Sequence, residues 1–155
     1  MKQKIRINES TLRKIVAESV RRVLKESIDI KQEVENVVNA MGSQIERWYG
    51  DDEFIDKHGC NGYIFNDEDE ARESVLNGYE HQNAVDYVDG AQTDEEWVNY
   101  LVHGGVDRNQ AMQIINNGDW DSVVSIIVDV YGPEWFLSTY SGSIHRLSNG
   151  QLLYF

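Results

Sequence analysis

The residues of this chain best suited to chemistry are its one cysteine, Cys60, and the two histidines nearest to it in sequence, His58 and His81. A cysteine becomes a nucleophile when a neighbouring base takes its proton and a third group, here Asp56 or Asp86, orients that base. The sequence brings these residue types near one another but gives no arrangement of them. A thiol enzyme is one hypothesis, and an inert loop cysteine packed beneath a sheet or helices is the alternative.

His58 and Cys60 are also two ligand types of a zinc site. A structural zinc site takes four ligands, however, and the chain has no second cysteine pair to complete it. His103 fits a helix C-terminus, where the dipole favours it, and His145 fits a hairpin strand. No P-loop, dinucleotide fingerprint, G-x-S-x-G or H-E-x-x-H motif occurs. We therefore expect no catalytic residues, no metal and no cofactor.

Charge divides the chain into two unequal parts. The net charge is −13, but residues 1–27 carry eight Lys or Arg against three Asp or Glu, and the other 128 residues carry six against 24. The first part is thus +5 and the second −18. Because an acidic body repels phosphate backbones, we expect no direct nucleic-acid binding by residues 28–155. No apolar run approaches the ~20 residues of a membrane span, so we expect no membrane partner.

The first 27 residues predict a basic amphipathic helix, which serves as an arm or a targeting segment. Its apolar side chains recur at spacings of three and four and share one stripe. This apolar stripe, the candidate partner-binding surface, consists of Leu12, Ile15, Val16, Val20, Val23 and Leu24. A helix of this length is marginal in water by itself, so the stripe needs a partner. That partner is either the chain's own body or another protein.

The string IRINESTLRKIVAESVRRVLKE resembles an N-terminal segment of many otherwise unrelated small proteins of tailed bacteriophages. The shared form is an Ile/Leu-rich lead, then E-S-x-L-x-x-I-V, then a basic run that ends in Leu-x-Glu. The resemblance implies a phage protein found in the virion or in the host cytoplasm. Leu24-Lys25-Glu26 is also similar to the sites cut by prohead proteases, which makes Glu26 a candidate processing site.

The rest of the chain predicts one acidic globular domain over residues 28–155. Helical spacing over 28–48 predicts a second helix, weakened at Gly42-Ser43. The short apolar run Tyr63-Ile64-Phe65 is a strand or a buried loop anchor. Asn66 or Asp67 can cap a helix that reaches 77.

Residues 93–131 predict three short helices joined by tight glycine turns. Thr93 and Glu96 form a capping box, and Asp107 and then Asp119 or Asp121 can cap the next two helices. This unit resembles a three-helix bundle of the ubiquitin-associated type. The apolar loop residues with which that family touches ubiquitin are replaced here, so the resemblance implies the shape without ubiquitin binding.

The tail over 134–155 predicts a β-hairpin, because Asn149-Gly150 separates two β-prone runs. We also predict a third strand over Trp135–Tyr140. The expected fold class is therefore α+β, mainly α-helical with a small C-terminal antiparallel β-hairpin or three-stranded meander.

From these observations we expect a non-enzymatic phage protein that its N-terminal helix directs to a capsid or another virion component. Its partner would be a phage structural protein. An acidic inhibitor of a basic host protein, such as a nucleic-acid-binding defence factor, is the alternative. A small thiol or metal-dependent enzyme is the second alternative.

Overall fold

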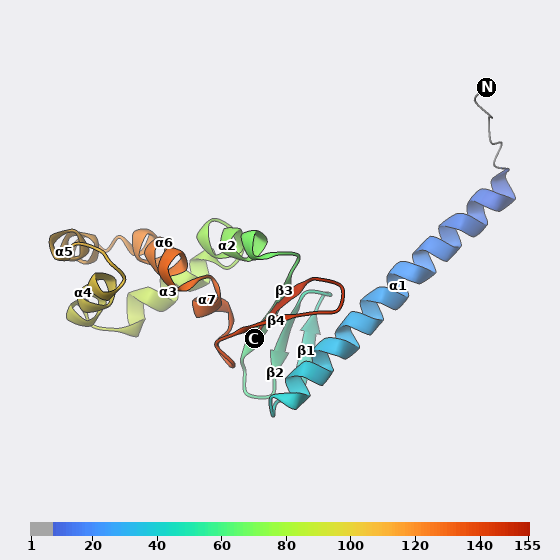
Figure 1. Cartoon of the computed structure of the whole chain (residues 1–155), viewed down its shortest axis with the longest axis horizontal. Coiled ribbons are helices and arrows are strands. Elements are labelled where there is room, and N and C mark those ends of the chain that lie inside the picture. The colour runs from blue at the N-terminus through green and yellow to red at the C-terminus, as the bar shows by residue number, and fades with distance from the viewer. Residues whose placement is uncertain (1–7) are drawn as a thin grey trace, which may run out of the picture.

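A computed structural model of the protein describes residues 8–155, with the backbone alone for residues 26–28. The described residues form seven helices and one antiparallel sheet of five strands (Figure 1). The helices are α1 (Glu9–Ala40), α2 (Glu68–Leu76), α3 (His81–Ala91), α4 (Asp94–His103), α5 (Arg108–Asn116), α6 (Trp120–Tyr131) and α7 (Glu134–Leu137). The strands are β1 (Ile45–Tyr49), β2 (Glu53–Asp56), β3 (Asn61–Phe65), β4 (Ile144–Arg146) and β5 (Leu152–Tyr154).

The sheet separates two hydrophobic cores. Its strand order is β1-β2-β3-β5-β4, so the C-terminal hairpin pairs with the strands near the N-terminus through β3 and β5. Side chains alternate across a strand, and in β5 Leu152 and Tyr154 enter the core shared with α2–α7 while Leu153 enters the core beneath α1. The result is three layers, with α1 on one face of the sheet and the other helices on the opposite face.

Helix α1 is continuous across the segment where the sequence predicted two helices. Asn8 caps it by accepting from the Thr11 N–H at 2.8 Å, and the helix ends before Gly42, whose φ of +87° suits glycine. The prediction of a helix over 28–48 was therefore wrong beyond Ala40. Ile45–Tyr49 instead forms β1, an edge strand antiparallel to β2.

The α+β class and its mainly helical content are confirmed, but the sheet is larger than the predicted hairpin or three-stranded meander. The hairpin itself is present as β4 and β5. The third strand predicted over Trp135–Tyr140 was wrong, because Pro133 has a φ of −66° that suits a helical turn and α7 follows it. The strand that extends the hairpin is β3, which pairs with β5.

Local capping explains why the helices on the far face were predictable. Thr93 and Glu96 form the expected capping box, and Asp67, Asp107 and Asp119 cap α2, α5 and α6. Helices α4, α5 and α6 contact one another. Close packing also constrains β3, since a Cβ atom on Gly62 would collide with the ring of the buried Phe54 on β2.

Candidate functional site

The apolar stripe predicted from the sequence lies on the part of α1 that projects away from the rest of the molecule (Figure 1). We call residues 9–25 of this helix the arm. All the arm's side chains are exposed, and those of the stripe retain between 45% (Ile15) and 64% (Val23) of their accessible surface. Within the described part of the chain, the stripe is therefore left uncovered.

The same stripe continues into the buried half of α1. Val34 and Val38 are fully buried beneath the sheet, and they follow Val16 and Val20 by 18 residues each. At 3.6 residues per turn, this separation is five full turns, so the two valine pairs share one face of the helix about 27 Å apart. One helical face is thus buried against the body at its base and stays about half exposed along the arm.

Two turns of the sheet hold α1 at the point where the arm begins. The Lys31 ammonium donates to the carbonyl oxygen of Gly50 at 2.9 Å, pairs with Asp51 at 2.9 Å and lies 5.0 Å from the centre of the Trp48 ring. On the same helix, the Glu33 carboxylate accepts from the backbone N–H of Ser148 at 2.8 Å and from its hydroxyl at 2.5 Å. These contacts fix the direction in which the arm leaves the body.

The sequence did not single out Lys31 or Glu33. Their partners lie in the β1–β2 turn and the β4–β5 turn, and no local pattern links residue 33 to residue 148. A concave surface of about 900 Å³ opens between the helix and these turns, lined by Val23, Ile30 and Asp52 among others. A partner that covers the stripe would reach this surface at the base of the arm.

The polar faces of the arm are basic. Five Lys or Arg stand against two Glu in residues 9–25, and Arg13 pairs with Glu9 at 2.7 Å. By helical spacing, Arg13 and Arg22 flank the stripe, while Lys14, Arg21 and Lys25 lie opposite it. The side chain of Glu26, the candidate processing site, lies outside the described residues.

The loop between β2 and β3 brings Asp56, His58 and Cys60 together as part of its own architecture. The fully buried Asp56 carboxylate accepts from the Ser43 hydroxyl at 2.5 Å and from the backbone N–H groups of His58 (2.9 Å) and Cys60 (2.7 Å). Burial by itself would raise the pKa of Asp56, but these hydrogen bonds outweigh it and lower that pKa. Asp56 therefore acts as the organising group of this loop.

The surroundings of Cys60 do not favour a thiolate. Burial, and then the negative charge of Asp56, raise the pKa of the Cys60 thiol, whereas a nucleophilic cysteine needs a lowered one. The His58 ring stacks on Tyr140 with ring centroids 6.2 Å apart. Burial and charge thus hold the Cys60 thiol in its protonated form, and the His58 ring lies against Tyr140.

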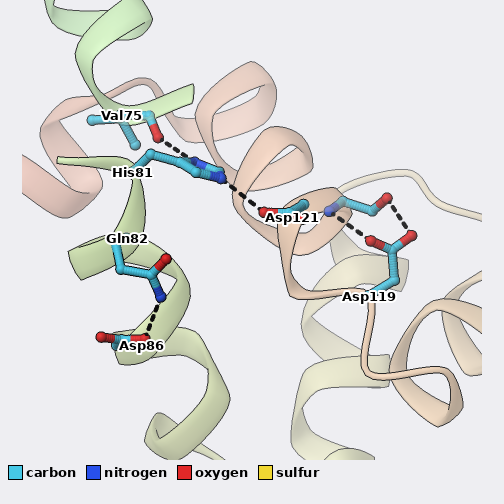
Figure 2. Close-up of polar contacts among 7 residues, drawn as sticks. Val75, His81, Gln82, Asp86, Asp119 and Asp121 are labelled. Carbon is cyan, nitrogen blue, oxygen red and sulfur yellow. Dashed lines mark hydrogen bonds and ion pairs between the residues drawn. The ribbon is translucent and has the colours of Figure 1, made fainter. Parts of the chain in front are cut away.

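His81 connects three helices (Figure 2). Its Nδ1 donates to the carbonyl oxygen of Val75 at 2.9 Å, near the end of α2, and its Nε2 lies 2.7 Å from the Asp121 carboxylate on α6. Both ring nitrogens thus have partners other than Cys60. Asp86, the other acid considered for a triad, accepts from Gln82 at 2.7 Å on the exposed side of α3.

The remaining histidines have local partners as well. His103, the last residue of α4, has its Nδ1 3.0 Å from the carbonyl oxygen of Asn99, and His145 lies on β4 as the sequence predicted. In residues 8–155 no group of three or more His, Cys, Asp or Glu is placed to hold a metal ion.

No helix of the described chain combines the length and the apolar character needed to cross a membrane. Comparisons with protein-family models, curated proteins and solved structures find no match to this chain. The fold and the site together define an α+β protein with a projecting basic amphipathic helix.

Proposed function

We propose that this chain is a non-enzymatic phage protein that docks on a virion component through the arm of α1. The proposal rests on one observation: six apolar side chains on one face of α1 are exposed, while the base of the same helix is buried against the body. A helix that served only the fold would bury its stripe along its whole length. The resemblance of residues 5–26 to phage N-terminal segments supports a phage structural protein as the partner.

The chemistry of the arm specifies the surface that would receive it. An apolar stripe flanked by Arg13 and Arg22 fits an apolar groove with acidic side chains on its rim. The stripe is about half exposed, so covering its six side chains contributes about 5–9 kcal/mol before the costs of association. Those costs are about 4–15 kcal/mol, so the acidic rim is needed for stable docking. The complex should therefore weaken as salt concentration rises.

The test compares two double variants in particles of the phage that encodes this chain. Val16→Ser with Val20→Ser makes the stripe polar, while Lys14→Ser with Arg21→Ser introduces the same side chain on the opposite face. Mass spectrometry of purified particles should detect the wild-type chain and the opposite-face variant, and should show strong depletion of the stripe variant. Absence of the wild-type chain from particles, despite expression in infected cells, would refute the proposal.

The same measurement examines processing at Glu26. If a prohead protease cuts there, the chain recovered from particles begins at Ser27. A protease needs extended backbone, so α1 would have to unwind locally around residue 26, while the buried Val34 and Val38 would keep the base in place. Recovery of the uncut chain alone would exclude processing.

The charge of the body favours one second candidate, an inhibitor that presents an acidic surface to a basic host protein. Residues 28–155 carry −18, and the first turns of α2 and α4 are acidic and exposed. Pulldown from host lysate with and without the arm, at low and high salt, separates the two functions. An acidic mimic should retain its partner without the arm and lose it at high salt.

A further inference from the structure

A cleft lies on the face of the sheet opposite α1, between the β2–β3 loop, α3 and α7. Its volume is about 610 Å³, within the range of roughly 300–1,000 Å³ typical of small-molecule sites. We call it the Glu80 cleft, and the residues used below line it: Cys60, Tyr63, Glu80, Tyr87, Trp135 and Ser138. Because the arm lies on the other face of the sheet, the proposal for this cleft does not depend on the proposal that the arm docks.

Glu80 places a buried carboxylate in this cleft. It is 6% exposed and accepts from the Tyr63 hydroxyl and from the Asn83 amide, both at 3.1 Å. Among the ion pairs of residues 8–155, none involves Glu80. A buried carboxylate is normally matched by a cation, since neutral hydrogen bonds compensate only part of its lost hydration.

Other acidic groups add to the negative potential around Glu80. Glu53 and Asp52 line a smaller concavity that shares Tyr63 and Glu80 with the cleft. Burial, followed by the charges of Glu80 and Asp52, raises the pKa of Glu53. Burial and then the charge of Glu80 likewise raise the pKa of the Tyr63 hydroxyl. A cation bound at Glu80 would relieve this repulsion.

Two further features of the cleft point to a ligand. The Ser138 hydroxyl is buried, with 4% of the residue exposed, and has no hydrogen-bond partner in the described chain although it lines the cleft. The wall beside it is aromatic, with the rings of Tyr87 and Trp135 edge to face at 5.7 Å. Aromatic faces attract cations, and an unpartnered hydroxyl can accept a hydrogen bond from one.

We propose that the Glu80 cleft binds an organic cation that carries N–H donors, namely a guanidinium or primary ammonium group on an alkyl chain. Glu80 supplies the counter-charge, and the Ser138 hydroxyl accepts a hydrogen bond from one N–H of the cation. The rings of Tyr87 and Trp135 cover the alkyl chain and the cation. The source of this group is either an Arg or Lys side chain of a peptide or a free alkyl diamine.

Cys60 provides a reporter for binding, because it is the only cysteine of the chain and lines the same cleft. The rate at which a neutral maleimide modifies Cys60 in the full-length protein is measured against rising concentrations of each probe. The probes are arginine blocked at both ends, its neutral isostere blocked citrulline, blocked lysine, and putrescine. Blocked arginine should slow the modification in a saturable manner, and blocked citrulline should not.

Glu80→Gln keeps the size of the side chain and removes its charge, and it should weaken binding of blocked arginine about tenfold or more. Asp89→Asn makes the same change in net charge at an exposed position of α3, the helix that Glu80 directly precedes, and should leave binding unchanged. Ser138→Ala should weaken binding by a smaller factor. If Glu80→Gln fails to fold, Ser138→Ala and the arginine–citrulline comparison on the wild-type chain still decide the question.

Equal protection by citrulline and arginine would refute the assignment, and so would unchanged affinity in Glu80→Gln. Failure of every cationic probe to protect Cys60 would refute it as well. Protection by blocked arginine or lysine identifies a peptide side chain as the ligand, whereas protection by putrescine alone identifies a free amine. Neither result bears on whether the arm docks.

Discussion

The two valine pairs of α1 allow a direct test of where the folded body ends and the proposed docking surface begins. Val34→Ala with Val38→Ala should destabilise the fold, while Val16→Ala with Val20→Ala should not. The four residues share one helical face, and the two pairs differ in burial, at 0% for Val34 and Val38 against 53% and 52% for Val16 and Val20. The two double variants thus make the same substitution, on the same helix and at the same spacing, and differ only in burial.

The expected magnitudes follow from burial. Each buried Val→Ala change removes about 1.6 kcal/mol of transfer free energy, plus a cavity term, so the buried pair should cost about 4 kcal/mol. For a chain of this size, that is a fall in Tm of about 8–16 °C. The exposed pair should change stability by less than about 0.5 kcal/mol, because alanine's higher helix propensity offsets the little apolar contact that is lost.

Guanidinium unfolding of both variants, followed by circular dichroism at two protein concentrations, measures these effects. If the exposed pair costs as much as the buried pair at both concentrations, the arm folds back on its own body and the docking proposal loses its physical basis. If the cost appears only at the higher concentration, the stripe is covered by a second copy of the chain.

Three further predictions concern the body. Gly62→Ala should cost about 1–3 kcal/mol in urea unfolding, because the added methyl collides with the ring of Phe54, and an unchanged midpoint would mean that the ring moves aside freely. Asp56 has a lowered pKa in the folded state, so the stability it contributes is present above its ordinary pKa and is lost as pH falls below about 4. The drop in unfolding midpoint between pH 7 and pH 3 should therefore be smaller in Asp56→Asn, and an unchanged drop would contradict this role. Thr93→Ala removes one half of a capping box and should cost about 1 kcal/mol by thermal unfolding, whereas no cost would show that α4 is held by its buried face alone.

The sequence predicted the elements whose determinants are local. A capping side chain acts on an N–H two or three residues away, so Thr93, Asp107 and Asp119 mark the starts of α4, α5 and α6 directly. Strands β1 and β2 were missed because their identity depends on pairing. β1 is a mostly exposed edge strand without clean alternation. Ile45 and Trp48 continue the helical spacing of Val34 and Val38, which carried the predicted helix past its true end at Ala40.

The same contrast between local and long-range determinants applies to the candidate sites. The stripe follows from helical periodicity, and the residues that could form it are all within one segment. The contacts that hold its base join Lys31 to Gly50 and Glu33 to Ser148. Glu80 accepts from Tyr63 of the sheet and lines one cleft with residues of α7. Such long-range neighbours leave no periodic trace in a single sequence.

The continuity of α1 explains why a pattern alone could not place the boundary between arm and body. The apolar stripe does not change at residue 28, because Val16 and Val34 are equivalent positions of one helical repeat. The cover over the stripe changes instead. The β1–β2 and β4–β5 turns are the last parts of the sheet that contact the helix, at Lys31 and Glu33. Beyond these turns the sheet ends and the helix does not. The docking surface that we propose arises because one helical repeat is longer than the body that covers it, and the partner's groove would extend the layer that the sheet begins.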